Sequence, residues 1–134
     1  MRVIVDANVA IAAVISRGLC EAIMELCLER HSLILCEGIL EEIEEKLRIK
    51  IKVPPPIIAD YVKVLRSNAQ LFEPEMIENA TCRDPDDLKI LGLVAPGNAD
   101  VIVTGDKDLL VIKEYKKARI MTPRGFWESN RKQK

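Results

Sequence analysis

Two apolar segments of this chain are each followed by aspartate. The run Val3–Val5 leads to Asp6, and the run 101–103 leads through a short turn to Asp106 and Asp108. Apolar runs of this length are typical of strands in sheets that are covered on both faces. Ligands of parallel α/β sheets bind beyond the carboxyl ends of the strands. If the two strands are neighbours, Asp6 and Asp106 meet at one edge of the sheet.

Carboxylates gathered on apolar strands need a counter-charge, because they repel one another and burial disfavours their charged form. A hard divalent cation would neutralise them, and ligands that are all oxygen favour Mg²⁺ or Mn²⁺ over zinc. Such ions act on phosphate-bearing substrates, where they activate water and stabilise charge on the oxygens. A single aspartate after a strand is more often a turn residue or a helix cap, so this interpretation depends on both segments together.

The cysteines and the lone histidine, His31, do not indicate a zinc site, because their spacing matches no zinc-ligand pattern. The four cysteines lie among apolar residues and are Cys20, Cys27, Cys36 and Cys82. Buried, reduced thiols are typical of a cytosolic protein. No apolar run reaches membrane-spanning length and no signal peptide is evident, so a cytoplasmic location is expected.

Composition indicates one globular domain. The chain has 134 residues, of which 49% are hydrophobic and 31% charged, enough to form a sizeable core. A formal net charge of -1 excludes a global basic field, so any nucleic-acid contact must come from a local patch. Aromatic residues make up only 4%, which argues against a stacking platform for single strands.

Strand patterns alternate with helix patterns along the chain, which favours a parallel α/β sheet with right-handed crossovers. The expected strands are 3–5, 33–35, 71–72, 101–103 and 119–121. The expected helices are 8–15, 19–30, 38–48, 57–68, 85–94, 109–115 and one around 126–127. Pro54–Pro56 should break the chain and start a helix, and Asp84 should cap the helix that begins at Pro85.

With these motifs in this order, the chain resembles the PIN-domain family of small metal-dependent ribonucleases. It is most similar to the branch formed by toxin components of prokaryotic toxin–antitoxin pairs (VapC-like). The resemblance rests on VIVDANV at 3–9, CEGILEEIEEKL at 36–47, RDPDDLKIL at 83–91, VIVTGDKDLL at 101–110 and IMTPRGF at 120–126. It implies one PIN-like domain over 1–134, a three-layer α/β/α sandwich with a short parallel sheet. Residues 129–134 are expected to be a frayed basic tail.

The resemblance also implies a cleft of acidic residues. The catalytic and metal-binding set carried over by position is Asp6, Glu42, Asp87 and Asp106, with Asp108 as a further metal ligand. Periodicity leaves Glu44 open as an alternative to Glu42, because the two flank the apolar stripe of their helix. Asp84 and Asp86 remain alternatives to Asp87. Asn8 and Thr104 match polar positions that support the cleft in relatives.

The function implied is hydrolysis of RNA phosphodiesters with Mg²⁺ or Mn²⁺, in a homodimer that a small antitoxin protein neutralises. Basic residues expected to contact RNA are Lys46, Arg48, Arg83, Lys107 and Arg124. One departure from the family pattern is Gly38, which lowers helix propensity by roughly 1 kcal/mol relative to alanine.

Two other readings compete with the ribonuclease. A Mg²⁺-dependent phosphohydrolase of the haloacid-dehalogenase type would need a second aspartate two residues after Asp6, where this chain has Asn8. A non-catalytic PIN-like module would keep the acids for the fold and use its groove only to bind a protein partner.

Overall fold

The computed structural model describes residues 1–78 and 84–132. Its strands form one sheet in the order β3-β2-β1-β4-β6-β5. The strands are β1 (Arg2–Val5), β2 (Ser32–Leu35), β3 (Gln70–Leu71), β4 (Val101–Val103), β5 (Glu114–Tyr115) and β6 (Ala118–Met121). All neighbours pair in parallel except β5, which runs antiparallel to β6. The expected parallel sheet is therefore confirmed, with one antiparallel strand added at its edge.

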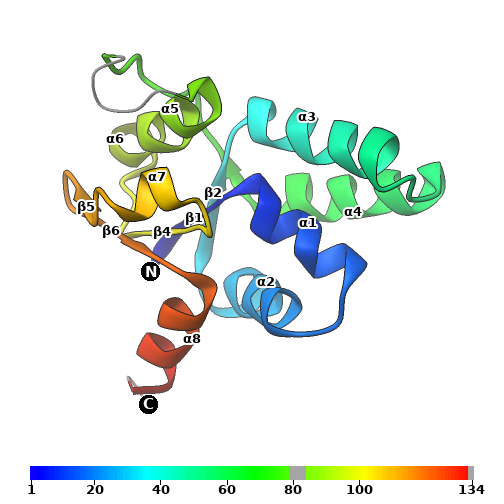
Figure 1. Cartoon of the computed structure of the whole chain (residues 1–134), viewed down its shortest axis with the longest axis horizontal. Helices are drawn as coiled ribbons and strands as arrows, with labels where there is room; N and C mark the ends of the chain where they lie inside the picture. Colours follow the sequence, from blue (N-terminus) through cyan, green and yellow to red (C-terminus); the bar gives the residue numbers. More distant parts are fainter. Residues whose placement is uncertain (79–83, 133–134) are drawn as a thin grey trace.

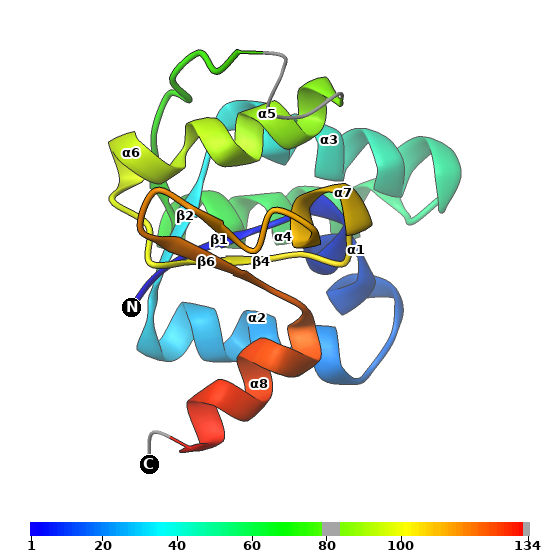
Figure 2. The same ribbon diagram turned by 60° about the vertical axis from the view of Figure 1, so that its left-hand side comes forward.

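Helices cover both faces of this sheet. They are α1 (Ala7–Ile15), α2 (Leu19–Arg30), α3 (Glu37–Glu45), a π-helix (Lys46–Lys50), α4 (Pro55–Asn68), α5 (Pro85–Gly92), α6 (Val94–Gly97), α7 (Lys107–Leu110) and α8 (Pro123–Lys132). Helices α2 and α8 lie on one side of the strands, and α3, α5 and α6 lie on the other (Figures 1 and 2). The predicted three-layer α/β/α sandwich is confirmed.

The register of β1 and β4 places the carboxyl ends of both strands at the same edge of the sheet. Val3 pairs with Val101 and Val5 with Val103, so the two strands end at the same level. Their side chains are buried, as expected for a sheet covered on both faces. The N–H of Asp6 donates to the Val103 carbonyl at 3.0 Å, which continues the pairing past the last strand residue. The two strands are therefore neighbours, which is the condition under which Asp6 and Asp106 were expected to meet.

Local signals placed most helix ends correctly. Asp84 caps α5, its side chain accepting the Asp86 N–H at 2.9 Å, and Pro85 is the first helical residue. Helix α4 begins at Pro55 within the proline run. Asn98 ends α6 in the left-handed conformation (φ 51°), which asparagine tolerates.

Two expected helices are wrong in part. The helix expected at 109–115 stops at Leu110, and Glu114–Tyr115 instead forms β5 and pairs with β6. Lys113 and Lys116 adopt positive φ values of 68° and 54°, and these two residues turn the chain on either side of β5. The helix expected at 38–48 changes at Lys46 into the π-helix, which the Ile51 N–H closes on the Lys46 carbonyl at 3.1 Å.

The structure also describes most of the expected basic tail and three of the four cysteines. Helix α8 runs to Lys132, so it takes in four of the six residues expected to form a basic tail; 133–134 lie outside the described residues. Cys27 and Cys36 are buried and Cys20 is half-buried, all as free thiols, whereas Cys82 falls outside the described part. Burial raises the pKa of Cys27 to about 12. Within residues 1–78 and 84–132, no helix is both long and apolar enough to span a membrane.

Candidate active site

Asp6 lies at the carboxyl end of β1 and is the N-cap of α1. Only 5% of its surface is exposed. Oxygen Oδ1 accepts the Asn8 N–H at 3.2 Å, and Oδ2 accepts the Thr104 hydroxyl at 2.7 Å. Thr104 follows β4, so this hydrogen bond joins the ends of the two central strands. The Asp6 carboxylate is therefore held in one place before any ligand binds.

Asp106 stands beside this contact because of the same threonine. Its N–H donates to Thr104 Oγ1 at 3.0 Å, while its carboxylate caps α7 by accepting the Asp108 N–H at 2.9 Å. Thr104 is fully buried. One buried hydroxyl thus connects the Asp6 side chain to the Asp106 backbone, and this fixes the turn that presents Asp106.

Three carboxylates from two separate segments converge here. Asp84, Asp87 and Asp106 each offer an oxygen, and these oxygens all lie within 4.8 Å of one another. Asp87 is 3% exposed, whereas Asp84 is open to solvent. Mg–O distances of about 2.1 Å place neighbouring ligand oxygens about 3 Å apart and opposite ones about 4 Å apart. The group therefore fits a hard divalent cation after small side-chain movements.

Asp84 joins this group and does not replace Asp87. Sequence reasoning ranked Asp84 as an alternative because the family's helix pattern favoured Asp87. Residues three apart on a helix share a face, however, so the cap and the first-turn acid point the same way. The structure thus makes Asp84 a candidate metal ligand, whereas the family pattern gave it only as an alternative to Asp87.

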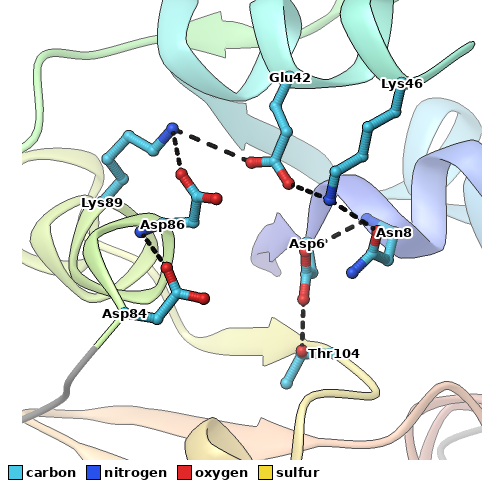
Figure 3. A network of polar contacts seen from close by, with 8 residues as sticks. All are labelled: Asp6, Asn8, Glu42, Lys46, Asp84, Asp86, Lys89 and Thr104. Carbon is cyan, nitrogen blue, oxygen red and sulfur yellow. Dashed lines mark hydrogen bonds and ion pairs between the residues drawn. The ribbon is translucent and has the colours of Figure 1, made fainter. Parts of the chain in front are cut away.

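Glu42 faces the cleft from α3, but it is already paired with two lysines (Figure 3). Its Oε2 accepts from Lys46 Nζ at 2.8 Å, and Lys89 Nζ of α5 lies 3.9 Å from its Oε1. The Glu42 side chain is 15% exposed. The alternative, Glu44, is 42% exposed and pairs with Arg48 at 2.8 Å. Geometry therefore turns Glu42 rather than Glu44 toward the cleft.

Each of these lysines has a second acceptor. Lys46 Nζ also donates to Asn8 Oδ1 at 3.3 Å, and Lys89 Nζ lies 3.0 Å from Asp86 Oδ1. The hydrogen bond to Glu42 raises the pKa of Lys46. Burial alone would lower the pKa of Lys89, but its hydrogen bond to Asp86 and the nearby Glu42 charge raise it. Both side chains are therefore held as ammonium ions across the gap between α3 and α5.

Sequence reasoning did not identify Lys89, and it offered Asp86 only as an alternative to Asp87. The signal was present, because Asp86 and Lys89 are three residues apart on a helix, a spacing that forms ion pairs. What the sequence could not show is that α5 lies beside α3, which brings Lys89 to Glu42. A cavity of about 310 Å³ opens at this junction and is lined in part by Gly38, Glu42, Lys46, Asp86 and Lys89.

Other predicted site residues lie at different distances from this centre. Asp6 and Glu42 are not part of the converging group, and Asp108 is exposed and contacts Asp106 through its backbone N–H. Lys107, next to Asp106, is exposed, as is Arg124 in the first turn of α8. The predicted RNA contact Arg83 lies outside the described residues.

Comparison with known proteins agrees with this architecture. The family model described as "PIN domain" matches residues 2–108. A search of curated proteins found no match. Nine chains of solved structures match. One belongs to the crystal structure of VapBC2 from Rickettsia felis, bound to a DNA fragment from their promoter. The likeness has a TM-score of 0.62 at 14% identity and covers 91% of this chain and 98% of that one.

Proposed function

The chain belongs to the PIN-domain family, and on that premise we propose that it is a metal-dependent ribonuclease that hydrolyses phosphodiester bonds in RNA. The observation that carries the proposal is the convergence of Asp84, Asp87 and Asp106 beside the ends of β1 and β4. These acids come from separate segments, yet their oxygens gather at the sheet edge where ligands of α/β folds bind.

In this proposal Asp84, Asp87 and Asp106 hold Mg²⁺ or Mn²⁺, and Asp6 supplies a fourth carboxylate beside them. A bound ion of this class lowers the pKa of water and stabilises charge on phosphate oxygens. Thr104 keeps Asp6 and the Asp106 turn at a fixed separation, so binding of the ion requires little reorganisation of these side chains. Lys107 stands next to Asp106 and is placed to contact the RNA backbone.

We further propose that the protein is the toxin component of a toxin–antitoxin pair, acts in the cytoplasm as a homodimer and binds a small antitoxin protein. Support comes from the similar fold of a chain of the Rickettsia felis VapBC2 complex. The test is co-expression with the product of the adjacent gene, which should copurify with the protein and suppress its RNA cleavage.

The central test is cleavage of mixed RNA by the purified protein. Activity should require Mg²⁺ or Mn²⁺ and disappear in chelator. Asp106→Asn should lower the rate by 100-fold or more, because asparagine can still cap α7 but carries no charge for the ion. Asp100→Asn, an aspartate at the opposite end of β4, is the matched control and should keep normal activity. Cleavage that survives in chelator or in Asp106→Asn would overturn the proposal, and partner binding without cleavage would favour a non-catalytic module.

A further inference from the structure

The side-chain amide of Asn8 is held in one orientation beside the acidic centre. Asn8 is the second residue of α1, and its backbone N–H donates to Asp6 Oδ1 at 3.2 Å. Its side-chain oxygen Oδ1 accepts from Lys46 Nζ at 3.3 Å, as Figure 3 shows. A lysine ammonium group can donate but cannot accept, so the amide must present its oxygen to Lys46. The amide nitrogen Nδ2 is therefore directed away from Lys46.

Lys46 is itself fixed by Glu42, one helical turn earlier. Its Nζ donates to Glu42 Oε2 at 2.8 Å, and the Lys46 side chain is only 29% exposed. This pair compensates the charge of Lys46, so little of that charge is left to attract a ligand. What Lys46 contributes is a hydrogen-bond donor at a fixed position. The contacts form a continuous chain from Glu42 through Lys46 and Asn8 to Asp6.

The Asn8 amide nitrogen is a donor that the fold leaves unused. Asn8 is exposed, and within residues 1–78 and 84–132 no acceptor is hydrogen-bonded to its Nδ2. The amides of Asn68 and Asn130 differ, since each donates to a carbonyl of its own helix, at 2.7 and 2.8 Å. An amide N–H cannot bind a cation, but it suits a phosphate oxygen, which asparagine side chains contact in nucleic-acid complexes. This donor lies next to Asp6, at the edge of the proposed cleavage site.

From these contacts we propose that Asn8 Nδ2 donates to a phosphate oxygen of the RNA, and that Lys46 is the positioning residue that keeps the amide in this orientation. The inference rests on the proposed function and adds a substrate contact to it. Glu42 keeps the ligand role that the family resemblance implies, while its Oε2 holds Lys46 in place. Without Lys46 the amide could turn over and present its oxygen, which a phosphate repels.

The first test measures binding of a fluorescently labelled single-stranded RNA by anisotropy, with Ca²⁺ as an oxygen-ligated ion in place of Mn²⁺. Asn8→Ala keeps the backbone N–H to Asp6 but removes the amide. It should bind RNA about 10-fold more weakly, as expected for one lost hydrogen bond to a charged group. Asn68→Ala is the matched control, because it removes an exposed amide that contacts α4, and it should bind RNA normally. Equal binding by the native protein and Asn8→Ala would overturn the proposal.

The second test asks whether Lys46 acts through Asn8. Lys46→Met keeps the aliphatic stem, and loss of the ammonium charge should weaken RNA binding in any background. If Lys46 orients the amide, this loss should be about 3-fold larger with Asn8 present than in Asn8→Ala, where no amide remains to be oriented. Equal losses in both backgrounds would contradict the positioning role. Lys46→Arg retains a donor and should restore most of the binding.

Nuclear magnetic resonance follows the amide itself. In isotope-labelled protein, the side-chain NH₂ signal that is missing from Asn8→Ala identifies Asn8. This signal should shift when the RNA is added, whereas the signal of Asn68 should stay in place. An unmoved Asn8 signal with RNA bound would overturn the proposal. Neither RNA binding nor this signal depends on turnover, so binding through Asn8 without cleavage would contradict only the ribonuclease proposal. Cleavage by a protein whose Asn8 signal does not move would contradict only the contact proposed for Asn8.

Discussion

The two ends of the β1–β4 pair use aspartate in opposite ways. At the amino end, Asp100 accepts the Arg2 N–H at 2.8 Å and lies 3.2 Å from Lys117 Nζ. At the carboxyl end, Asp84 and Asp106 lie against another carboxylate, and residues 1–78 and 84–132 offer neither of them an ion-pair partner. The strands and the residue type are the same, and only the partners differ.

The difference separates a structural acid from a candidate functional one. The Arg2 N–H, followed by Lys117, holds the pKa of Asp100 below its usual value, so its charge is satisfied within the fold. The Arg2 guanidinium also donates to the Gly97 carbonyl and to Gln70 Oε1, which ties three segments together at this end. At the carboxyl end, Asp84 and Asp106 each accept a backbone N–H but also lie against another carboxylate, so a bound cation would relieve the repulsion between like charges there.

The largest effect should appear when Mn²⁺ is added. At 100 times its dissociation constant, the ion should raise the unfolding free energy of the native protein by about 2.7 kcal/mol. Asp106→Asn should lose this gain, yet be as stable as the native protein without metal, because one repelling charge is gone. Asp100→Asn should keep the gain. Thermal unfolding with and without Mn²⁺ measures this gain in the native protein and in both variants. Equal gains in Asp106→Asn and Asp100→Asn would contradict the difference between the two ends of the β1–β4 pair.

A smaller effect is expected from Thr104→Val. The change leaves Asp6 Oδ2 and the Asp106 N–H without the buried hydroxyl that joins them, and a lost buried partner costs about 1–3 kcal/mol. Urea denaturation should show this loss together with slower RNA cleavage. Thr104→Ser keeps the hydroxyl and should recover most of both. Unchanged stability and cleavage in Thr104→Val would show that the carboxyl end of the β1–β4 pair does not depend on the Thr104 hydroxyl.

The smallest effect is expected from Asp100→Asn, about 1 kcal/mol of stability at neutral pH, because the side chain is 38% exposed and solvent screens its pairs. Since the folded pKa is lowered, this contribution is present above the unfolded pKa of about 4 and is lost as pH falls through the folded value. Chemical denaturation of both proteins should therefore show a difference at pH 7 that shrinks below pH 4. A difference that grows on acidification would contradict this assignment.

Sequence patterns predicted the sheet because its strands are short apolar runs that need burial on both faces. They also predicted α5, since Asp84 and Pro85 mark a helix start within two residues. The segment 109–115 shows the limit of such reasoning. Its apolar residues suit a helix, but pairing with β6 makes Glu114–Tyr115 a strand. Antiparallel pairing with the next strand, across the two-residue turn at Lys116 and Lys117, outweighed the helix preference of this segment.

The amino-acid sequence by itself determined that Asp6 and Asp106 each follow a short buried strand, because strand length and burial on both faces come from the local apolar pattern. That β1 and β4 pair side by side was decided by the tertiary structure. Only the tertiary structure decided that Asp84 joins Asp87 and Asp106, that Glu42 rather than Glu44 faces the cleft, and that Lys89 reaches it past Gly38. These contacts depend on how α3, α5 and α7 pack around the sheet. Separations of a few ångströms between helices are set by the whole core, and no short stretch of sequence encodes them.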